Sequence, residues 1–196
     1  MFARFEKTYL LIIGVLLLLF AILETVNGRL WMNDLNVYYS AAQAYLDGSA
    51  VYGKHFGLQS GYFKYSPATL LPFSLYALLP FGVAKTAHLI MLGGSAILSM
   101  IMAHRLFSEA SSLSPLRKGL SILLICTLLI AVHWHREIHL GNINLILLAM
   151  LLGAFRYHKH TLISSMLLGL AILFKPHFVI LVPVLIWNYK WKTALL

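Results

Sequence analysis

A single carboxylate, Asp34, lies in a polar, tyrosine-rich segment that follows the first apolar run of the chain. The segment extends from Trp31 to Gly48, and the whole chain of 196 residues contains only 6 Asp and Glu residues. An ionised carboxylate can accept a proton from a hydroxyl group, which is the task of a general base. Asp34 can also cap a helix, whose N-terminus favours a negative charge, so the two roles are compatible. This segment provides the best candidate for acid–base chemistry.

Two further clusters place a lysine beside aromatic or proline residues. The first, Gly61-Tyr-Phe-Lys-Tyr-Ser-Pro67, contributes Tyr62, Lys64 and Tyr65, whose rings offer flat surfaces and whose ammonium group can pair with phosphate. The second, Lys175-Pro176-His177, lies between two apolar runs, where a lysine is costly unless it reaches water or meets an anion. Each cluster is equally well explained as an interfacial aromatic belt or a short basic turn.

A fourth cluster, His133-Trp-His-Arg-Glu-Ile-His-Leu-Gly-Asn-Ile-Asn144, combines three histidines with Arg136 and two amides. Zinc proteases use the order His-Glu-x-x-His, which this segment lacks, so we expect no metal. Arg136 and His139 could hold a phosphate, although polar residues at a membrane interface are the simpler explanation. The amides of Asn142 and Asn144 precede an apolar run, where they can cap a helix or bind hydroxyl groups.

The composition points to the membrane as the place where these clusters are held. Hydrophobic residues make up 60% of the chain and charged residues 11%, whereas soluble domains are about 45–50% apolar and about 25% charged. The net charge of +9 comes from 15 Lys and Arg residues. These residues lie at the ends of apolar runs, which suits lipid headgroups and basic cytoplasmic loops rather than nucleic acid. The lone Cys126 excludes a disulfide within the chain and a cysteine metal cluster.

The apolar runs predict an all-α polytopic bundle of about six to seven hydrophobic helices that forms a single membrane domain over residues 1–196, because backbone groups in lipid must pair within their own helix. The expected runs are Tyr9–Glu24, Pro67–Pro80, Lys85–Phe107, Gly119–Trp134, Asn142–Phe155, Leu162–Phe174 and Phe178–Trp187. Residues 27–66 are expected to lie outside the cytoplasm. Within them, Leu35, Tyr38, Tyr39, Ala42 and Leu46 recur at helical spacing and predict a short amphipathic helix in the interface, ended by Gly48.

The basic segments Arg156–His160 and Asn188–Lys192 should be cytoplasmic by the positive-inside rule. Alternation from a cytoplasmic N-terminus puts them outside if every run crosses the membrane. The short, proline-interrupted run Pro67–Pro80 is the first candidate for a segment that does not cross. The positive-inside rule is statistical, so the alternative that every run crosses and the basic segments lie outside stays open. The chain stops at Leu196 without a tail, and we expect it to be the N-terminal part of a longer fold.

Taken in order, these clusters resemble glycosyltransferase family 87, whose members are polytopic enzymes of the GT-C superfamily. The resemblance covers residues 30–192 and rests on succession: Asp34 with the Tyr-Tyr-x-Ala-Ala-x-Ala pattern that starts at Tyr38, then Tyr62-x-x-Tyr65-x-Pro67, then Gly141-Asn142-x-Asn144, then Lys175-Pro176. Two features differ from the family pattern. The usual Gly-Gln-x-Asn has the shorter amide Asn142 here, and the chain is far shorter than typical members.

The resemblance implies transfer of a hexose, most often mannose, from a polyprenyl-phosphate carrier to a glycan or glycolipid acceptor outside the cytoplasm of a bacterium, at its plasma (inner) membrane. It implies an inverting, metal-independent reaction with no cofactor, in which Asp34 is the catalytic carboxylate. Lys64, Arg136 and Lys175 are the candidates for stabilising the departing phosphate, with Lys175 first. The remaining substrate-binding candidates are Asn36, Tyr38, Tyr39, Tyr62, Tyr65, His139, Asn142, Asn144 and His177.

Two other classes of protein fit the same residues. A transporter or flippase for a lipid or an anion would also use broken helices and a buried lysine, and inverted repeats would favour it. A non-catalytic membrane subunit is the third possibility, and it is favoured if replacing Asp34 by Asn changes nothing.

Overall fold

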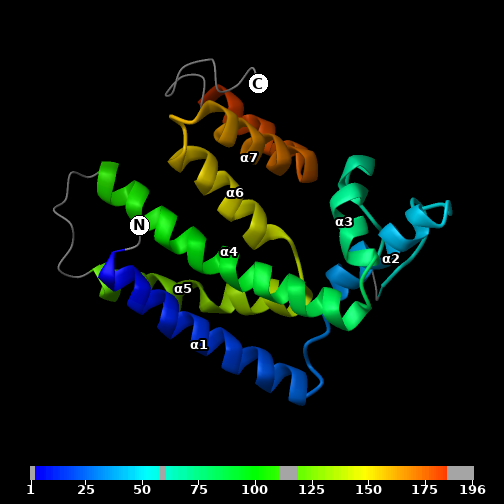
Figure 1. Ribbon diagram of the computed structural model, residues 1–196, viewed down its shortest axis with the longest axis horizontal. Coiled ribbons are helices and arrows are strands. Elements are labelled where there is room, and N and C mark those ends of the chain that lie inside the picture. Colours follow the sequence, from blue (N-terminus) through cyan, green and yellow to red (C-terminus); the bar gives the residue numbers. More distant parts are fainter. Residues whose placement is uncertain (1–2, 58–60, 111–118, 185–196) are drawn as a thin grey trace. The chain divides into compact units, whose positions relative to one another are not determined.

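The computed structural model describes residues 3–57, 61–110 and 119–184. Its elements are helices (Figure 1). The loops that join them contain one isolated antiparallel bridge, between His55 and Tyr62. The α-helices are α1 Arg4–Val26, α2 Asn33–Leu46, α3 Leu70–Ala77, α4 Phe81–Ala110, α5 Gly119–Leu140, α6 Asn144–Arg156 and α7 Thr161–Phe174; short 3-10 helices occupy η1 Pro67–Thr69 and η2 Pro176–Ile180. The predicted all-α membrane class is confirmed.

Three of these helices, α1, α4 and α5, are long and apolar enough to cross a bilayer. A membrane helix needs about 20 residues, and their lengths are 23, 30 and 22 residues. By contrast α3 has 8 residues, which corresponds to about 12 Å of helix against about 30 Å of hydrocarbon. The proline-containing run that begins at Pro67 therefore forms no helix long enough to cross on its own.

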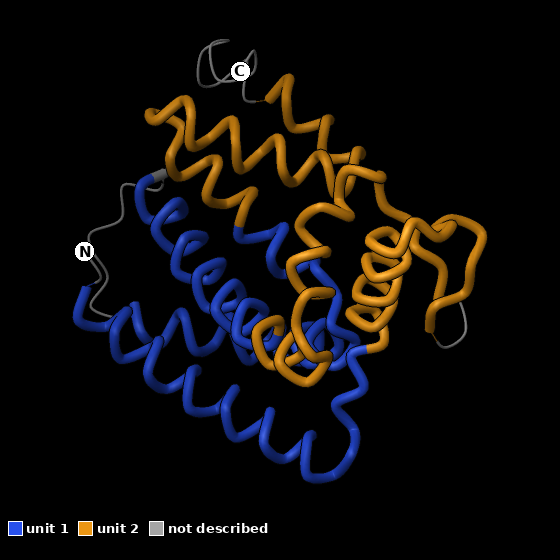
Figure 2. The backbone as a smooth tube through the Cα atoms, turned by 45° about the vertical axis from the view of Figure 1, so that its right-hand side comes forward, with its two compact units in different colours: residues 1–32, 89–149 blue, residues 33–88, 150–196 orange. Residues whose placement is uncertain are grey.

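The chain divides into two compact units (Figure 2). Unit 1 comprises residues 1–32 and 89–149 and holds α1, most of α4, α5 and the start of α6. Its core is built from apolar side chains of these helices, among them Tyr9, Leu92, Leu123 and Ile138. The Tyr9 hydroxyl is paired with Thr127 Oγ1 at 2.6 Å, so its polar end is satisfied inside an apolar core.

Unit 1 also contains an ion pair between α1 and α4. Arg105 Nε donates to Glu6 Oε1 at 2.7 Å, and the backbone N–H of Ala3 donates to Glu6 Oε2 at 2.8 Å. Glu6 is 2% exposed, and a buried carboxylate is tolerated only when it is paired and hydrogen-bonded. The pair therefore fixes the start of α1 against the far end of α4.

Unit 2 comprises residues 33–88 and 150–196. Here α2 packs along α3, and α7 contacts both short 3-10 helices. The end of α6 packs on α7 through Ala154 and Leu168, and Ser164 Oγ donates to the Ala154 carbonyl at 2.8 Å. A small residue and a serine at a helix crossing allow close approach of the two backbones.

Several predicted boundaries are corrected. The amphipathic helix runs from Asn33 to Leu46 and is followed by Gly48 at φ +68°, as expected for a C-terminal glycine. Its covered face also includes Val37 and Ala41, whereas Leu46, expected on the apolar face, is 50% exposed because it lies at the end of the helix.

Helix α5 continues past Trp134 to Leu140, so the histidine cluster is helical. Local hydrogen bonding lets a helix continue through polar residues at a membrane face. The predicted run Phe178–Trp187 begins within η2, and its last residues lie outside the described part of the chain, as does the segment Asn188–Lys192.

Candidate functional site

Asp34 lies in the first turn of α2 and is half-buried. The preceding Met32 adopts a left-handed conformation at φ +47° and is fully buried, with its N–H donating to the His139 carbonyl at 3.0 Å. A left-handed conformation is uncommon for a residue other than glycine and must be held by its surroundings. The turn that leads into α2 is thus fixed by burial and by one backbone hydrogen bond within unit 1.

The loop after α2 is held against the helix at two points in unit 2. Asn36 Nδ2 donates to the Phe56 carbonyl at 3.3 Å. A Cβ on Gly57 would lie 2.8 Å from both Asn33 Oδ1 and Val37 Cγ2, so only glycine allows this approach of loop and helix. The amide of Asn36, a predicted substrate contact, therefore has a structural partner.

An aromatic cluster forms the centre of the site, and its members are Tyr38, Phe63, Tyr65, Phe73 and Phe174. The Tyr38 ring stacks on Phe73 with centroids 4.6 Å apart, and the Tyr38 and Tyr65 hydroxyls lie 3.1 Å apart. Phe174 meets Phe73 at 5.5 Å and Tyr65 at 6.3 Å. Stacked and edge-to-face pairs at such distances are favourable. Three of the predicted motifs thus converge within unit 2.

Lys175 follows directly after Phe174, at the end of α7. The lysine is half-buried in an extended conformation (φ −134°, ψ 94°), and its N–H donates to the Ala171 carbonyl at 2.9 Å. Pro176 starts the 3-10 helix, because a proline is tolerated where its missing N–H would have no partner. His177 is exposed, with its ring 4.5 Å from that of Phe178.

The remaining predicted residues of unit 2 lie outside the aromatic cluster. Tyr39 is buried and donates its hydroxyl to the Leu79 carbonyl at 2.9 Å. Tyr62 and Lys64 are exposed, and the Tyr62 ring meets the edge of the His55 ring at 5.2 Å. Asp34 and Tyr38 are four residues apart on α2 and share a helix face, so the carboxylate is on the side of α2 that carries the cluster.

The other four predicted residues, Arg136, His139, Asn142 and Asn144, belong to unit 1, at the corner between α5 and α6. The corner turns at Gly141, with φ +69°. The Asn142 side chain accepts the Asn144 N–H at 3.3 Å and so caps α6, as expected for asparagine. Asn144 Nδ2 donates to Glu137 Oε2 at 2.8 Å.

Two histidines of α5, His135 and His139, face α1. The rings of His135 and His139 lie parallel with centroids 5.8 Å apart, and His139 Nδ1 lies 3.6 Å from Glu24 Oε2. Trp31 contacts the His139 ring at 5.5 Å, and Phe20 contacts His135 at 5.2 Å. Among the residues that the structure describes, no three His, Cys, Asp or Glu side chains are arranged to hold a metal ion.

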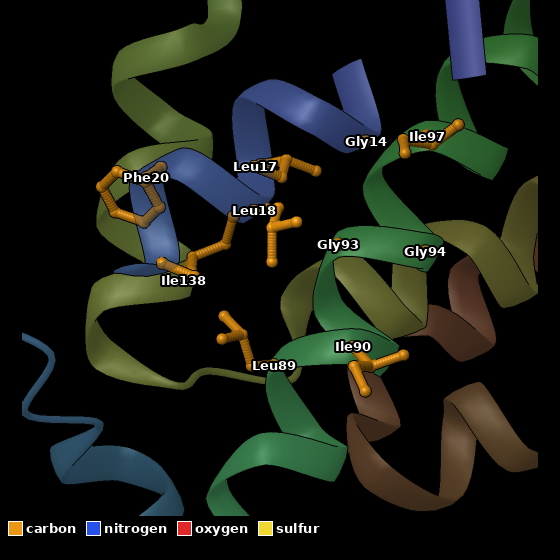
Figure 3. Close-up of a pocket in the computed structure, with 11 residues that line it drawn as sticks. Gly14, Leu17, Leu18, Phe20, Leu89, Ile90, Gly93, Gly94, Ile97 and Ile138 are labelled. Carbon is orange, nitrogen blue, oxygen red and sulfur yellow. The ribbon is translucent and has the colours of Figure 1, made fainter. Parts of the chain in front are cut away.

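Unit 1 also contains an apolar pocket of about 300 Å³ between α1 and α4 (Figure 3). Its lining includes Gly14, Gly93 and Gly94, and it holds no titratable side chain. A Cβ on Gly93 would reach Leu17 at 3.4 Å, whereas one on Gly94 would meet nothing within 4 Å. Gly93 thus allows α4 to approach α1 closely, while Gly94 borders open space.

Sequence reasoning did not assign three residues that organise these sites. Phe73 and Phe174 belong to apolar runs, and Phe174 also borders the Lys175-Pro176-His177 cluster, but nothing in the period of an apolar helix singles out one ring. Glu137 was noted for breaking a zinc motif, although a carboxylate seven residues before Asn144 in an acid-poor chain was the signal that could have identified it.

Comparison with known proteins identifies the family to which the chain belongs. The profile of glycosyltransferase family 87 matches residues 63–196. A curated relative, the alpha-(1->3)-arabinofuranosyltransferase of Corynebacterium glutamicum, is 27% identical over 175 residues, which cover 87% of this chain and 40% of the relative. The chain thus spans less than half the length of this relative. No solved structure gives a significant match. Since the profile covers more than half of the chain, the protein belongs to glycosyltransferase family 87.

Proposed function

We propose that this protein transfers a sugar from a polyprenyl-phosphate-linked donor to a glycan or glycolipid acceptor at the outer face of a bacterial plasma (inner) membrane. The observation that carries this proposal is the aromatic cluster, which joins the α2 motif, the Tyr62–Tyr65 motif and the Phe174–Lys175 turn within unit 2. It brings a carboxylate-bearing helix and a lysine-bearing turn to the same group of rings.

In the proposed reaction the acceptor hydroxyl attacks the anomeric carbon of the donor sugar and gives its proton to the Asp34 carboxylate. A new carbon–oxygen bond forms, and the bond from the anomeric carbon to the phosphate oxygen breaks with its electron pair remaining on the phosphate. Attack from the face opposite the phosphate inverts the anomeric configuration. The charge on Lys175 stabilises the leaving phosphate, a task that otherwise falls to a metal ion.

The position of Asp34 supports its role as the base. It lies in the first turn of α2, where the helix N-terminus favours a negative charge. The carboxylate is half-buried rather than enclosed, so a hydroxyl group can approach it. The side chain shares a helix face with Tyr38, a buried member of the aromatic cluster, so the carboxylate lies on the side of α2 that carries the cluster.

The helix lengths support a site that faces away from the cytoplasm. Because α3 is too short to cross the membrane, α1 takes the chain from a cytoplasmic N-terminus to the outer side, α4 returns it to the cytoplasm, and α5 takes it to the outer side again. We further propose that α6 and α7, whose 13 and 14 residues fall short of the about 20 that an upright span needs, cross with the help of their flanking residues. This puts Arg156–His160 in the cytoplasm, in agreement with the positive-inside rule. Under this topology Asp34, Asn144 and Lys175 all face outward.

Two sugars are candidates for transfer. Mannose is the hexose that the family resemblance implies. The 27% identical relative is named as an arabinofuranosyltransferase, which favours a pentofuranose as the second candidate. Both would be carried on a polyprenyl phosphate, so the role of Lys175 at the phosphate is the same for either.

The test compares sugar transfer by the wild type, Asp34→Asn and Asp47→Asn in membranes at equal expression, supplied with labelled polyprenyl-phosphate mannose or polyprenyl-phosphate arabinofuranose. Asp47 is exposed just after α2 and serves as a matched control. We expect transfer by the wild type and Asp47→Asn with one of the donors, and none by Asp34→Asn. Equal transfer by all three would remove Asp34 from the mechanism.

A further inference from the structure

Glu137 is a buried carboxylate with a defined set of contacts in unit 1. The residue is 9% exposed and lies in the last turn of α5. Its Oε2 accepts from Asn144 Nδ2 at 2.8 Å, and its Oε1 lies 3.5 Å from Arg136 Nη2. The Arg136 side chain is 69% exposed, and an exposed ion pair contributes little. The Asn144 amide is therefore the principal partner of this carboxylate.

This contact fixes which way the Asn144 amide points. An ionised carboxylate only accepts hydrogen bonds, so the NH₂ group of Asn144 must face Glu137. The carbonyl oxygen Oδ1 is thereby turned to the opposite side. A carbonyl oxygen has two lone pairs, so it can accept from a sugar hydroxyl even beside a bond within the protein.

Glu137 also holds the rest of the Gly141-Asn142-x-Asn144 motif. Its backbone carbonyl accepts the Asn142 N–H at 3.0 Å, and Asn142 Oδ1 in turn accepts the Asn144 N–H at 3.3 Å. One residue thus binds both asparagines, one through its main chain and the other through its side chain. Burying a carboxylate costs free energy of folding, and apolar residues of similar volume would often stabilise the corner better. A role in function would explain why a carboxylate occupies this position.

We propose that Glu137 is a positioning residue for sugar transfer: it orients Asn144 so that the Asn144 carbonyl oxygen accepts a hydrogen bond from a sugar hydroxyl. The inference rests on the proposed function and adds a hydroxyl contact to it. Glu137 itself touches no substrate.

The test uses Glu137→Ala, Asn144→Asp and the exchanged pair Glu137→Gln/Asn144→Asp. Glu137→Ala removes the hydrogen-bond partner of the Asn144 amide, which can then rotate. Asn144→Asp places a second carboxylate beside that of Glu137, and the two repel each other. The exchanged pair restores one donor and one acceptor with the polarity reversed, and the aspartate still presents an oxygen to the sugar. Transfer is measured with the same two labelled donors, as kcat/KM per folded protein, beside thermal unfolding in detergent.

We expect both single variants to lose roughly tenfold to a hundredfold in kcat/KM, the scale of a misplaced contact, and the exchanged pair to recover most of that loss. A purely structural role would instead make each single variant unfold more easily and leave its kcat/KM per folded protein unchanged.

Glu6→Gln controls for the loss of stability, since Glu6 is another buried glutamate in an ion pair of unit 1, away from the α5–α6 corner. It should unfold more easily yet keep its kcat/KM per folded protein. If Glu137→Ala transfers sugar like the wild type, or the exchanged pair is no better than Asn144→Asp, the inference is wrong while the proposed function stands. If the wild type transfers neither sugar, the proposed function fails and this inference fails with it.

Discussion

Tyr65 belongs to the second motif of the family succession and Phe174 directly precedes the last one, and their rings lie 6.3 Å apart in unit 2. Phe73 contacts both, at 6.3 Å from Tyr65 and 5.5 Å from Phe174. Phe174 is the last residue of α7, so its packing determines where the next residue, Lys175, emerges from the helix. The aromatic cluster thus positions the lysine that the proposed reaction needs.

Replacing Phe174 by alanine should therefore impair donor use as well as stability. The lost packing should cost about 3 kcal/mol of unfolding free energy, and the displaced Lys175 should raise the KM for the donor. Phe155→Ala is the matched control, because Phe155 packs on Ala154 and Leu168 in the same unit, outside the cluster. Thermal unfolding in detergent measures the loss of stability, and steady-state transfer measures the KM for the donor. An equal rise of the donor KM in both variants would show that Phe174 has no specific role in positioning Lys175.

Lys175→Ala should weaken donor use more than acceptor use, because its charge is proposed to act on the donor phosphate. We expect the KM for the donor to rise or kcat to fall, with the KM for the acceptor nearly unchanged. Lys175→Arg keeps the charge and should recover part of the loss. Lys159→Ala, in an exposed turn of the same unit, serves as the control for removing a positive charge. Equal losses for donor and acceptor would count against the phosphate role.

The fold class could be predicted from the sequence because apolar runs in lipid leave the backbone little choice but helix. The extent of each helix was less predictable. Helix α5 continues through its polar last turns to Leu140, and α1 begins at Arg4 rather than Tyr9. Hydropathy marks where a helix is buried in lipid, not where its hydrogen bonds end.

The motifs of the candidate site could be predicted from the sequence, but the way in which their residues come together in space could not. Tyr38, Tyr65 and Lys175 were selected by type and spacing, yet their association depends on Phe73 and Phe174, which pack them together. The role of Asn36 was not predictable either, because its partner is the backbone carbonyl of Phe56, and any residue carries such a carbonyl.

Gly57→Ala should loosen the loop from α2. The added Cβ would lie 2.8 Å from Asn33 Oδ1 and from Val37 Cγ2, too close for ordinary contact. We expect lower thermal stability and reduced transfer, since α2 carries Asp34 in the turn that Gly57 presses against. Gly169→Ala is the control, because a Cβ there meets nothing within 4 Å and alanine favours helix. Equal stability of Gly57→Ala and the wild type would show that the loop moves aside freely.

The orientation of the site can be tested with single cysteines, because the chain contains only Cys126. In a Cys126→Ser background, Ser49→Cys and Lys159→Cys introduce thiols at two exposed positions, one after α2 and one in the turn between α6 and α7. A membrane-impermeant thiol reagent added to intact cells should label position 49 and should label position 159 only after permeabilisation. Labelling of both from outside would mean that α6 does not return to the cytoplasm. The proposed topology would then be wrong, because an α7 that crosses from the outer face would carry Lys175 to the cytoplasmic side, away from Asp34.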